Sequence, residues 1–330
     1  MTGRKVARDS DSPSGVRPHI PVLLSEVLSA LRVKAGETYL DGTFGAGGYS
    51  TAILDAADCK VLALDRDPSV IEAAHKITPR YPNRLTVVLS PFSAMQEVWR
   101  VYRGRDVNGQ YVAPQADGIV LDIGVSSMQI DQPERGFSFM TDGPLDMRMS
   151  ADGESAADIL NTASDTEIAD ILYKYGEERQ SRRIAKAIVA ARADKKFTRT
   201  LELANLVEKV IGRKPGDHKH PATRTFQGLR IAVNDELGEL STALEAAETM
   251  LKPGGRLVVV TFHSLEDRIV KDFMRERSDL AAKGSRFLPE EKKSAPRFQI
   301  VNRRALSPTQ EELVLNPRAR SARLRAAVRT

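Results

Sequence analysis

Short apolar runs that end at an acidic residue or a glycine constrain the fold of this chain more than any other feature. Residues 61–65 (VLALD) and 118–124 (GIVLDIG) are each long enough for one buried strand. Residues 39–42 and 85–89 have the same character, and the segments between these runs have helical periodicity. Strands that alternate with helices predict an α/β fold with a doubly wound, mostly parallel sheet covered on both faces. A last apolar run at 256–262 (RLVVVTF) would complete this sheet.

The strand pattern disappears between residues 150 and 225 and gives way to helical periodicity alone. Ser164 and Glu167 have the spacing of a capping box, and Gly212 is placed to end a later helix. We therefore expect an all-helical domain inserted into the sheet domain. The expected division is a flexible N-terminal tail over 1–17, a discontinuous sheet domain over 18–135 and 226–330, and an inserted helical domain over 136–225.

Cysteine content and hydropathy exclude several classes of protein. Cys59 is the single cysteine, so neither a disulfide framework nor a zinc site built on several cysteines is possible. No apolar run approaches the roughly 20 residues of a membrane span, and residues 1–17 lack the apolar stretch of a signal peptide. We expect a cytoplasmic protein without a membrane anchor.

Positive charge is concentrated at the C-terminal end of the chain. Residues 281–330 contain twelve Lys and Arg and four acidic residues, a net +8, so a total of +5 leaves −3 for the rest. Such a basic region predicts a polyanionic partner. From charge alone, a solvated basic surface without a partner explains it equally well.

A glycine-rich segment follows the first expected strand. Residues 41–48 (DGTFGAGG) lack the last glycine of the dinucleotide motif, because Ser50 stands in its place. This favours a ligand without a pyrophosphate, such as S-adenosyl-L-methionine, although a plain strand-to-helix turn has the same composition. Asp65 ends the next strand, 20 residues after Gly45. An acid at that position typically accepts hydrogen bonds from ribose hydroxyls.

The ends of the neighbouring strands predict further contacts with the same ligand, because ligands of such sheets bind at the carboxyl edge. Asp122 ends the fourth strand, and Phe92, after the third, could pack on an adenine face or in the core. A nucleotide-binding dehydrogenase and a non-catalytic RNA-binding assembly factor remain alternatives at this point.

Ten sequence blocks together resemble one family. They are 19–24 (HIPVLL), 41–48 (DGTFGAGG), 63–68 (ALDRDP), 121–127 (LDIGVSS), 134–139 (ERGFSF), 142–149 (DGPLDMRM), 175–179 (YGEER), 220–227 (HPATRTFQ), 261–268 (TFHSLEDR) and 316–321 (NPRARS). In this order they are similar to the RsmH family, older name MraW. Its members methylate the exocyclic N4 of a cytidine in the decoding centre of 16S ribosomal RNA.

This resemblance implies a Rossmann-like class I methyltransferase fold with an inserted helical domain, and S-adenosyl-L-methionine as the cofactor. No metal is implied. Tyr49 stands where the family usually has histidine, so only a backbone contact carries over there. The expected cofactor-binding residues are Gly45, Gly47, Gly48, Tyr49, Asp65, Phe92, Asp122 and Gln129.

The resemblance also implies a partner, 16S rRNA in the small ribosomal subunit, and leaves open whether the protein is a monomer or a homodimer. We hypothesise that Asp122 or the backbone near Ser126 orients the cytosine amine, although Asp122 could instead serve only the cofactor. RNA binding should rest on the basic C-terminal region and the helical insertion, and the target base should leave its stack. Candidate substrate residues are Arg135, Phe137, Asp146, Arg148, His220, Arg224, Phe226, Arg230, Asn234 and His263.

Overall fold

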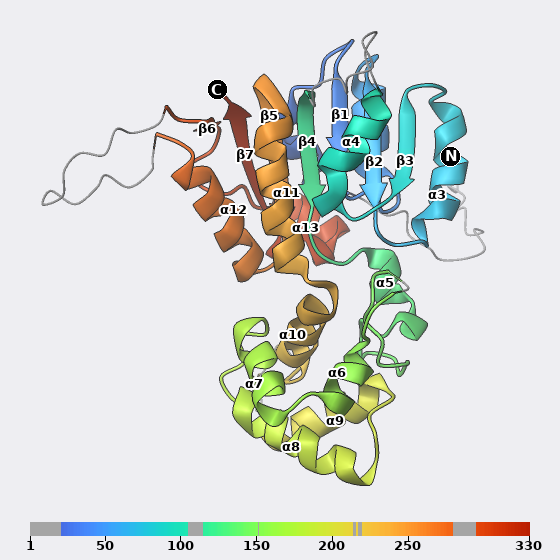
Figure 1. Ribbon diagram of the computed structural model, residues 1–330, viewed down its shortest axis with the longest axis vertical. Coiled ribbons are helices and arrows are strands. Elements are labelled where there is room, and N and C mark those ends of the chain that lie inside the picture. Colours follow the sequence, from blue (N-terminus) through green and yellow to red (C-terminus); the bar gives the residue numbers. More distant parts are fainter. Residues whose placement is uncertain (1–20, 105–114, 151, 214–215, 217–219, 280–294) are drawn as a thin grey trace, which may run out of the picture.

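The computed structural model describes residues 21–104, 115–150, 152–213, 216, 220–279 and 295–330. It contains two units joined at a narrow waist, an α/β unit and a helical unit (Figure 1). The N-terminal tail predicted over 1–17 lies outside the described residues, as do residues 105–114. Within the described residues, no helix combines the length and the apolar composition needed to cross a bilayer.

The α/β unit is built on one seven-stranded sheet with the order β3-β2-β1-β4-β5-β7-β6. Strands β1 to β5 run parallel, whereas β7 is antiparallel to β5 and β6 is antiparallel to β7. The predicted doubly wound, mostly parallel sheet is therefore confirmed. Its strands are β1 (Thr38–Asp41), β2 (Lys60–Asp65), β3 (Leu85–Leu89), β4 (Ala116–Asp122), β5 (Leu251–Thr261), β6 (Phe298–Ile300) and β7 (Arg323–Arg329).

Helices cover both faces of this sheet, because its strands are apolar on both sides. Helices α1 (Leu24–Leu31), α2 (Gly48–Ala56) and α3 (Val70–Ile77) contribute to one buried layer. Helices α4 (Met95–Arg103), α11 (Glu236–Met250) and α12 (Ser264–Glu276) contribute to the other. The short helix α13 (Gln310–Leu315) precedes β7 in the chain.

The helical unit is inserted between β4 and β5. It follows α5 (Ser127–Asp131) and comprises α6 (Ala156–Thr162), α7 (Asp165–Lys174), α8 (Ser181–Asp194), α9 (Thr200–Ile211) and α10 (Thr223–Asn234). It has a core of its own, separate from the two layers on the sheet. The expected capping box of Ser164 and Glu167 begins α7, and Gly212 ends α9.

The second boundary predicted for the insertion, at 225/226, falls inside α10. Phe226 and Leu229 of this helix are buried in the core of the helical unit. We propose that the insertion extends to the end of α10. Helices α10 and α11 are separated at Asp235, whose φ of 46° lies in the left-handed region.

Part of the basic C-terminal region belongs to the sheet, as strands β6 and β7. Arg325 on β7 forms a bidentate ion pair with Asp267 of α12, at 2.7 and 2.9 Å. Arg297 and Arg277 both contact the buried carboxylate of Glu248 on α11. Several of the charges expected to bind RNA are therefore used to attach β6 and β7, which sequence periodicity did not reveal.

Candidate active site

A pocket lies at the carboxyl edge of β1, β2 and β4, where Asp41, Asp65 and Asp122 end the three strands. The strand order reverses its direction between β1 and β4, and such a switch point is the usual ligand site of an open α/β sheet. The loops after β1, β2, β3 and β4 line this pocket. The sequence analysis placed a ligand site at the carboxyl ends of these strands, and the structure has a pocket there.

The glycine-rich loop leads directly into α2. Gly45 and Gly47 have φ values of 52° and 79°, the left-handed region that favours glycine. A side chain on Gly47 would also come within 2.5 Å of Ile77 Cδ1. Gly45 and Gly48 line the pocket, whereas Gly47 is the N-cap residue of α2 and shapes the loop behind it.

Asp65 connects this loop to the end of β2. Its Oδ2 accepts a hydrogen bond from the Gly45 backbone at 2.8 Å, and its Oδ1 accepts one from the Asp67 backbone at 2.9 Å. Burial raises the pKa of Asp65 above its usual value, although these backbone donors oppose the shift. Each carboxylate oxygen keeps a further lone pair that could accept a hydroxyl from a ribose.

Asp41 is fully buried beneath the pocket. Its carboxylate accepts hydrogen bonds from Ser50 Oγ at 2.7 Å and from the Thr43 backbone at 3.1 Å. Burial nevertheless raises its pKa to about 6, with a further contribution from the charge of Asp65.

Asp122 ends β4 at the pocket wall. Burial and the neighbouring charges of Asp41 and Glu266 raise its pKa well above the usual value. Among the described residues, its Oδ1 has no hydrogen-bond partner. Since buried polar atoms are nearly always satisfied, this oxygen is a candidate acceptor for a donor on a ligand in the pocket.

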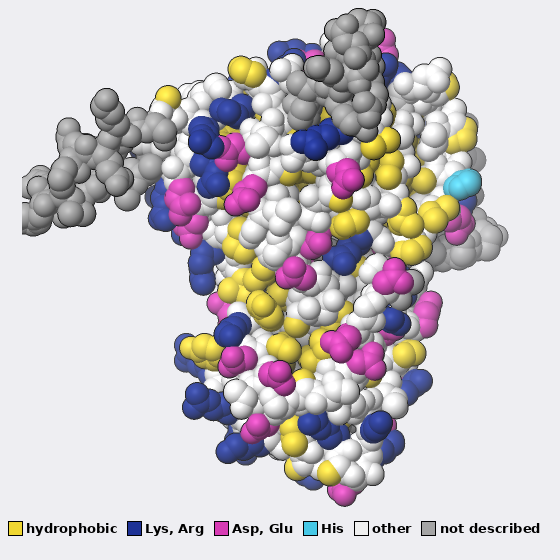
Figure 2. Space-filling view, in the orientation of Figure 1, with side chains coloured by type: hydrophobic (Ala, Val, Ile, Leu, Met, Phe, Trp, Pro, Cys, Tyr) yellow, Lys and Arg dark blue, Asp and Glu magenta, His cyan; other side chains and the backbone are white. Residues whose placement is uncertain are grey.

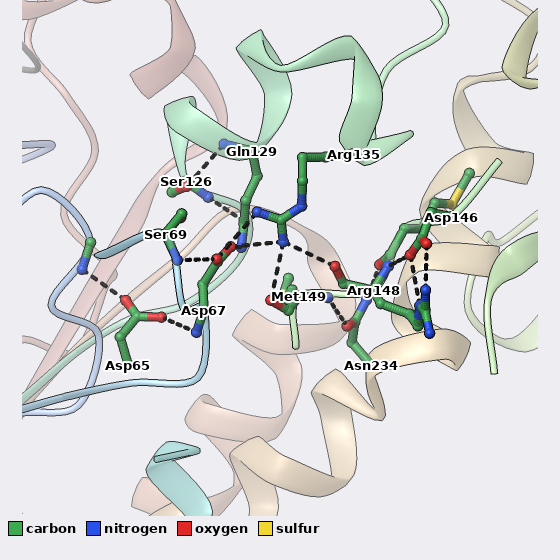
Figure 3. A network of polar contacts seen from close by, with 12 residues as sticks. Asp65, Asp67, Ser69, Ser126, Gln129, Arg135, Asp146, Arg148, Met149 and Asn234 are labelled. Carbon is green, nitrogen blue, oxygen red and sulfur yellow. Dashed lines mark hydrogen bonds and ion pairs between the residues drawn. The ribbon is translucent and has the colours of Figure 1, made fainter. Parts of the chain in front are cut away.

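A polar network on the other side of the pocket is centred on Asp67 (Figure 3). Asp67 accepts hydrogen bonds from Gln129 Nε2 at 2.6 Å, from Ser69 N at 2.9 Å, and from Arg135 at 2.9 and 3.2 Å. Burial would raise the pKa of Asp67, but these donors more than offset it and the pKa is lowered. Gln129 and Ser126 also form the capping box that begins α5.

Arg135 extends this network to the segment that leads into the helical unit. Its guanidinium also donates to the carbonyls of Arg148 and Met149, at 3.0 and 3.1 Å. Asn234, at the end of α10, accepts from the Met149 backbone at 2.8 Å and donates to the Met147 carbonyl at 2.7 Å. Arg135 thus joins the α/β unit to the helical unit beside the pocket, and Asn234 holds the same segment from within the helical unit (Figure 3).

Comparison with known proteins identifies the family of this chain. A sequence model of the MraW methylase family matches residues 16–330. The chain belongs to the MraW methylase family. Curated relatives named ribosomal RNA small subunit methyltransferase H agree with this assignment. The relative from Paramagnetospirillum magneticum is 56% identical over 95% of this chain and 96% of its own length. The relative from Maricaulis maris is 58% identical over 95% of this chain and 92% of its own length. The relative from Azorhizobium caulinodans is 54% identical over 100% of this chain and 92% of its own length.

Membership of the MraW methylase family confirms the resemblance carried by the ten sequence blocks. The predicted Rossmann-like methyltransferase fold with a helical insertion is also confirmed, since the sheet is mostly parallel and helices are inserted between β4 and β5. The matched relatives are covered over nearly their whole length, so both units of this family member belong to the shared architecture.

Most of the cofactor-binding residues expected of a MraW methylase meet at the pocket. Tyr49 lines it with a buried ring whose hydroxyl donates to the Val22 carbonyl. Phe92, in the 3₁₀ turn after β3, lines the pocket and also packs against the core layer containing α4. Ser126 and Gln129 line it from the start of α5. The roles of these residues stay predictions.

The candidate substrate residues of this MraW methylase are more scattered. Arg230 lines the pocket and forms a bidentate pair with Glu236, at 2.7 and 2.9 Å. Arg224 lies in a second cleft. Asp146 and Arg148 pair with each other at 2.7 Å.

The aromatic and histidine candidates mainly pack within the molecule. Phe226 is buried in the core of the helical unit and Phe137 packs against that core. The His220 ring stacks near Phe139, with centroids 4.7 Å apart. The Nε2 atom of His263 lies 2.9 Å from Oε1 of the fully buried Glu266. A contact between these side chains and substrate stays a prediction.

Several pocket residues escaped the sequence analysis. Asp67, Met149 and Phe262 line the pocket, as do Asn316 and Arg318 near the C-terminus. The signal for Asp67 was its place two residues after Asp65. Asn316 and Arg318 lie in the block 316–321 already quoted, but nothing local showed that this block returns to the pocket.

A group of possible metal ligands lies beside α10, formed by Glu236, His263 and Glu266. Arg230 already pairs with Glu236, and His263 with Glu266. Since both carboxylates have cationic or hydrogen-bonding partners, we assign no metal to this group.

Proposed function

We propose that this protein transfers a methyl group from S-adenosyl-L-methionine to the exocyclic N4 of a cytidine in the decoding centre of 16S ribosomal RNA. Family membership supports methyl transfer, and the names of the relatives support small-subunit ribosomal RNA as substrate. The observation that carries the proposal is the unpaired Oδ1 of the buried Asp122 at the pocket wall. Such an acceptor suits an amine donor. The same proposal places the protein in the cytoplasm.

The chain's own residues fit this cofactor. The backbone at Gly45 and Gly48 can approach the ligand closely, and Asp65 can accept hydrogen bonds from the ribose. Phe92 offers an aromatic face for the adenine. Three buried carboxylates at adjacent strand ends also favour a positively charged ligand, because their mutual repulsion is then reduced.

The reaction requires an oriented nucleophile. When bound, the cofactor would supply a methyl group on a positively charged sulfur. Attack by the cytosine amine would form the N–C bond and break the S–C bond, which leaves a neutral thioether, and the amine would give its proton to solvent. Asp122 Oδ1 or the backbone near Ser126 would hold the amine through its hydrogens and align its nitrogen with the methyl carbon. The apolar side chains of Phe92, Phe262 and Met149 would keep water from the site.

Two alternatives compete with this proposal. One keeps the chemistry and changes the substrate to another RNA or to DNA. The other is a non-catalytic ribosome assembly factor. Membership of a methylase family favours an enzyme.

Methyl transfer to small ribosomal subunits tests the function directly. Labelled cofactor is incubated with the protein and with subunits from cells that lack the gene, and the labelled nucleotide is then mapped. Label on N4 of one decoding-centre cytidine is expected. Label on another nucleotide would change the substrate, and an inactive protein that still binds subunits would favour the assembly factor.

The role of Asp122 is tested by measuring cofactor affinity and turnover separately for Asp122→Asn. Normal affinity with turnover reduced about 100-fold would assign it to the amine. Lost affinity would assign it to the cofactor.

A further inference from the structure

A second cleft lies at the waist, between the helical unit and the first turns of α12. It is separate from the cofactor pocket and shares no lining residue with it. It is lined by side chains of α7, of the loop after α7, of the start of α10 and of α12. The polar and aromatic ones are Tyr173, Lys174, Glu177, Arg179, Arg224 and Arg268.

The charge of this cleft is strongly positive, with four cations and one acid. Arg179 and Arg224 are exposed, and no hydrogen bond or ion pair joins their side chains to another part of the described chain. Lys174 pairs with Asp170 at 2.9 Å, and Arg268 is 3.8 Å from Glu177. Two arginines are therefore available to an anion from outside. Figure 2 shows Lys and Arg side chains continuing along the edge of the helical unit.

Glu177, the acid of the cleft, bonds to α12 and pairs with neither Arg179 nor Arg224. Ser264 Oγ, at the start of α12, donates to Glu177 Oε2 at 2.6 Å. This hydrogen bond joins the two units across the cleft. Glu177 has a φ of 50°, in the left-handed region that is costly for a residue with a side chain.

An exposed aromatic ring lies among the cations. Tyr173 on α7 is 63% exposed, which is unusual for a large side chain with no partner to cover it. Exposed aromatic rings next to arginines are the pattern by which proteins hold single-stranded RNA, with bases stacked on the ring and phosphates on the guanidinium groups.

Helix α10 borders both the cleft and the cofactor pocket. Arg224 lies in the cleft and Arg230 in the pocket, six residues further along the same helix. At 1.5 Å per residue they are about 9 Å apart along the helix axis. Phe262 and Leu265, three residues apart, connect the two sites along a second path. Consecutive nucleotides of one strand could therefore occupy both sites.

We infer that this cleft binds a nucleotide of the substrate RNA close to the target base, with its phosphate on Arg179 and Arg224 and its base stacked on Tyr173. This inference rests on the proposed function, because it assumes that a single RNA strand enters the cofactor pocket. It assigns the helical unit a direct part in holding the strand while the target base is out of its stack.

Steady-state kinetics on small ribosomal subunits test this inference. Tyr173→Ala and Arg224→Ala should each raise the KM for the subunit about tenfold and leave kcat within about twofold, because they remove binding away from the reacting atoms. Cofactor affinity should be unchanged. Arg100→Ala is the matched control, because Arg100 is an exposed arginine on α4 of the α/β unit.

Conservative variants separate the two contacts. Tyr173→Phe keeps the ring and should restore the KM. Arg224→Lys keeps the charge and should bring the KM most of the way back to that of the unaltered protein. Arg224→Ala should also reduce the salt dependence of binding to a single-stranded RNA oligonucleotide, by about 0.7 in the slope of log affinity against log salt.

Unchanged KM in both alanine variants would overturn the inference while leaving the proposed function intact. No methyl transfer by the unaltered protein would overturn the proposed function instead. Equal losses in kcat and kcat/KM would also contradict the inference, because they would indicate a contact made only in the transition state.

Discussion

At the scale of single residues, four aspartates near the pocket show how surroundings decide the charge of identical side chains. Asp41, Asp65 and Asp122 are buried near one another, and burial raises the pKa of each. Asp67 is also buried, but Arg135 and Gln129 hold its pKa below the usual value. The first three favour a cationic ligand, whereas Asp67 is a fixed anion that the fold itself neutralises.

Binding of the cofactor should release protons near pH 6. Asp41, with a pKa of about 6, is half protonated there, and a cationic ligand favours its ionised form. Affinity for S-adenosyl-L-methionine should therefore rise with pH from about 5 to about 7. Titration calorimetry in two buffers of different ionisation enthalpy should detect up to about half a proton per ligand from this group.

S-adenosyl-L-homocysteine, which lacks the sulfonium charge, is the control for that release. It should release fewer protons, and Asp41→Asn should reduce the release seen with the charged ligand. Equal release by both ligands would show that the sulfonium charge is not sensed by these carboxylates.

Removal of the Arg135 side chain should destabilise the protein by about 3 kcal/mol, because Asp67 would remain as a buried anion without its cation. Arg275→Ala removes an exposed pair with Asp272 and should cost about 0.5 kcal/mol. Denaturant unfolding of both variants measures the difference. Equal losses would mean that solvent replaces Arg135 at Asp67.

At the scale of elements, close packing of α7 against α10 fixes the second cleft. Gly176 directly follows the last residues of α7, and a Cβ there would lie 2.4 Å from the Arg224 carbonyl oxygen. A Cβ on Gly228 of α10 would lie 3.0 Å from the backbone nitrogen of Gly176. The two backbones approach closely because neither residue carries a side chain, and this approach sets the positions of Tyr173 and Arg224.

Gly176→Ala should therefore destabilise the helical unit by about 2 kcal/mol through overpacking against backbone atoms. Gly228→Ala is the control, since its tighter packing is offset by a gain in helix propensity of up to about 1 kcal/mol, and it should be nearly neutral. Thermal unfolding followed by far-ultraviolet circular dichroism tests the pair. A neutral Gly176→Ala variant would mean that α7 and α10 move apart at little cost.

At the scale of the whole molecule, two units with separate cores meet at the cofactor pocket and at the second cleft. Arg135 joins them at the first site, and Glu177 joins them at the second. Under the proposed function, the sheet would hold the cofactor while the helical unit holds the RNA.

Cofactor at about 100 times its dissociation constant should stabilise the α/β unit by about 2.7 kcal/mol. Trp99 is the single tryptophan and is buried in this unit, so its fluorescence reports the unfolding of that unit alone. NAD at the same concentration should have no effect. Asp65→Ala should abolish the stabilisation, whereas Asp58→Ala, which removes a carboxylate that is 89% exposed, should keep it. Stabilisation by NAD instead would revive the dehydrogenase alternative.

Sequence alone determined the features that depend on neighbouring residues. The apolar runs gave β1 to β5, the glycines gave the loop before α2, and the spacing of Ser164 and Glu167 gave the start of α7. These features are local because hydrophobic periodicity, left-handed backbone and helix caps each involve a few consecutive residues. Family membership followed from the order of the motifs.

Only the tertiary structure decided which charged side chains are free. Arg135 meets Asp67 across 68 residues, and Arg325 meets Asp267 across 58. Neither pairing leaves a periodic signal in the sequence, so basic residues that bind acids within the fold could not be told from those that remain for RNA. Arg224 and Arg179 belong to the second group because the packing of α7, α10 and α12 brings them together without an acid for each.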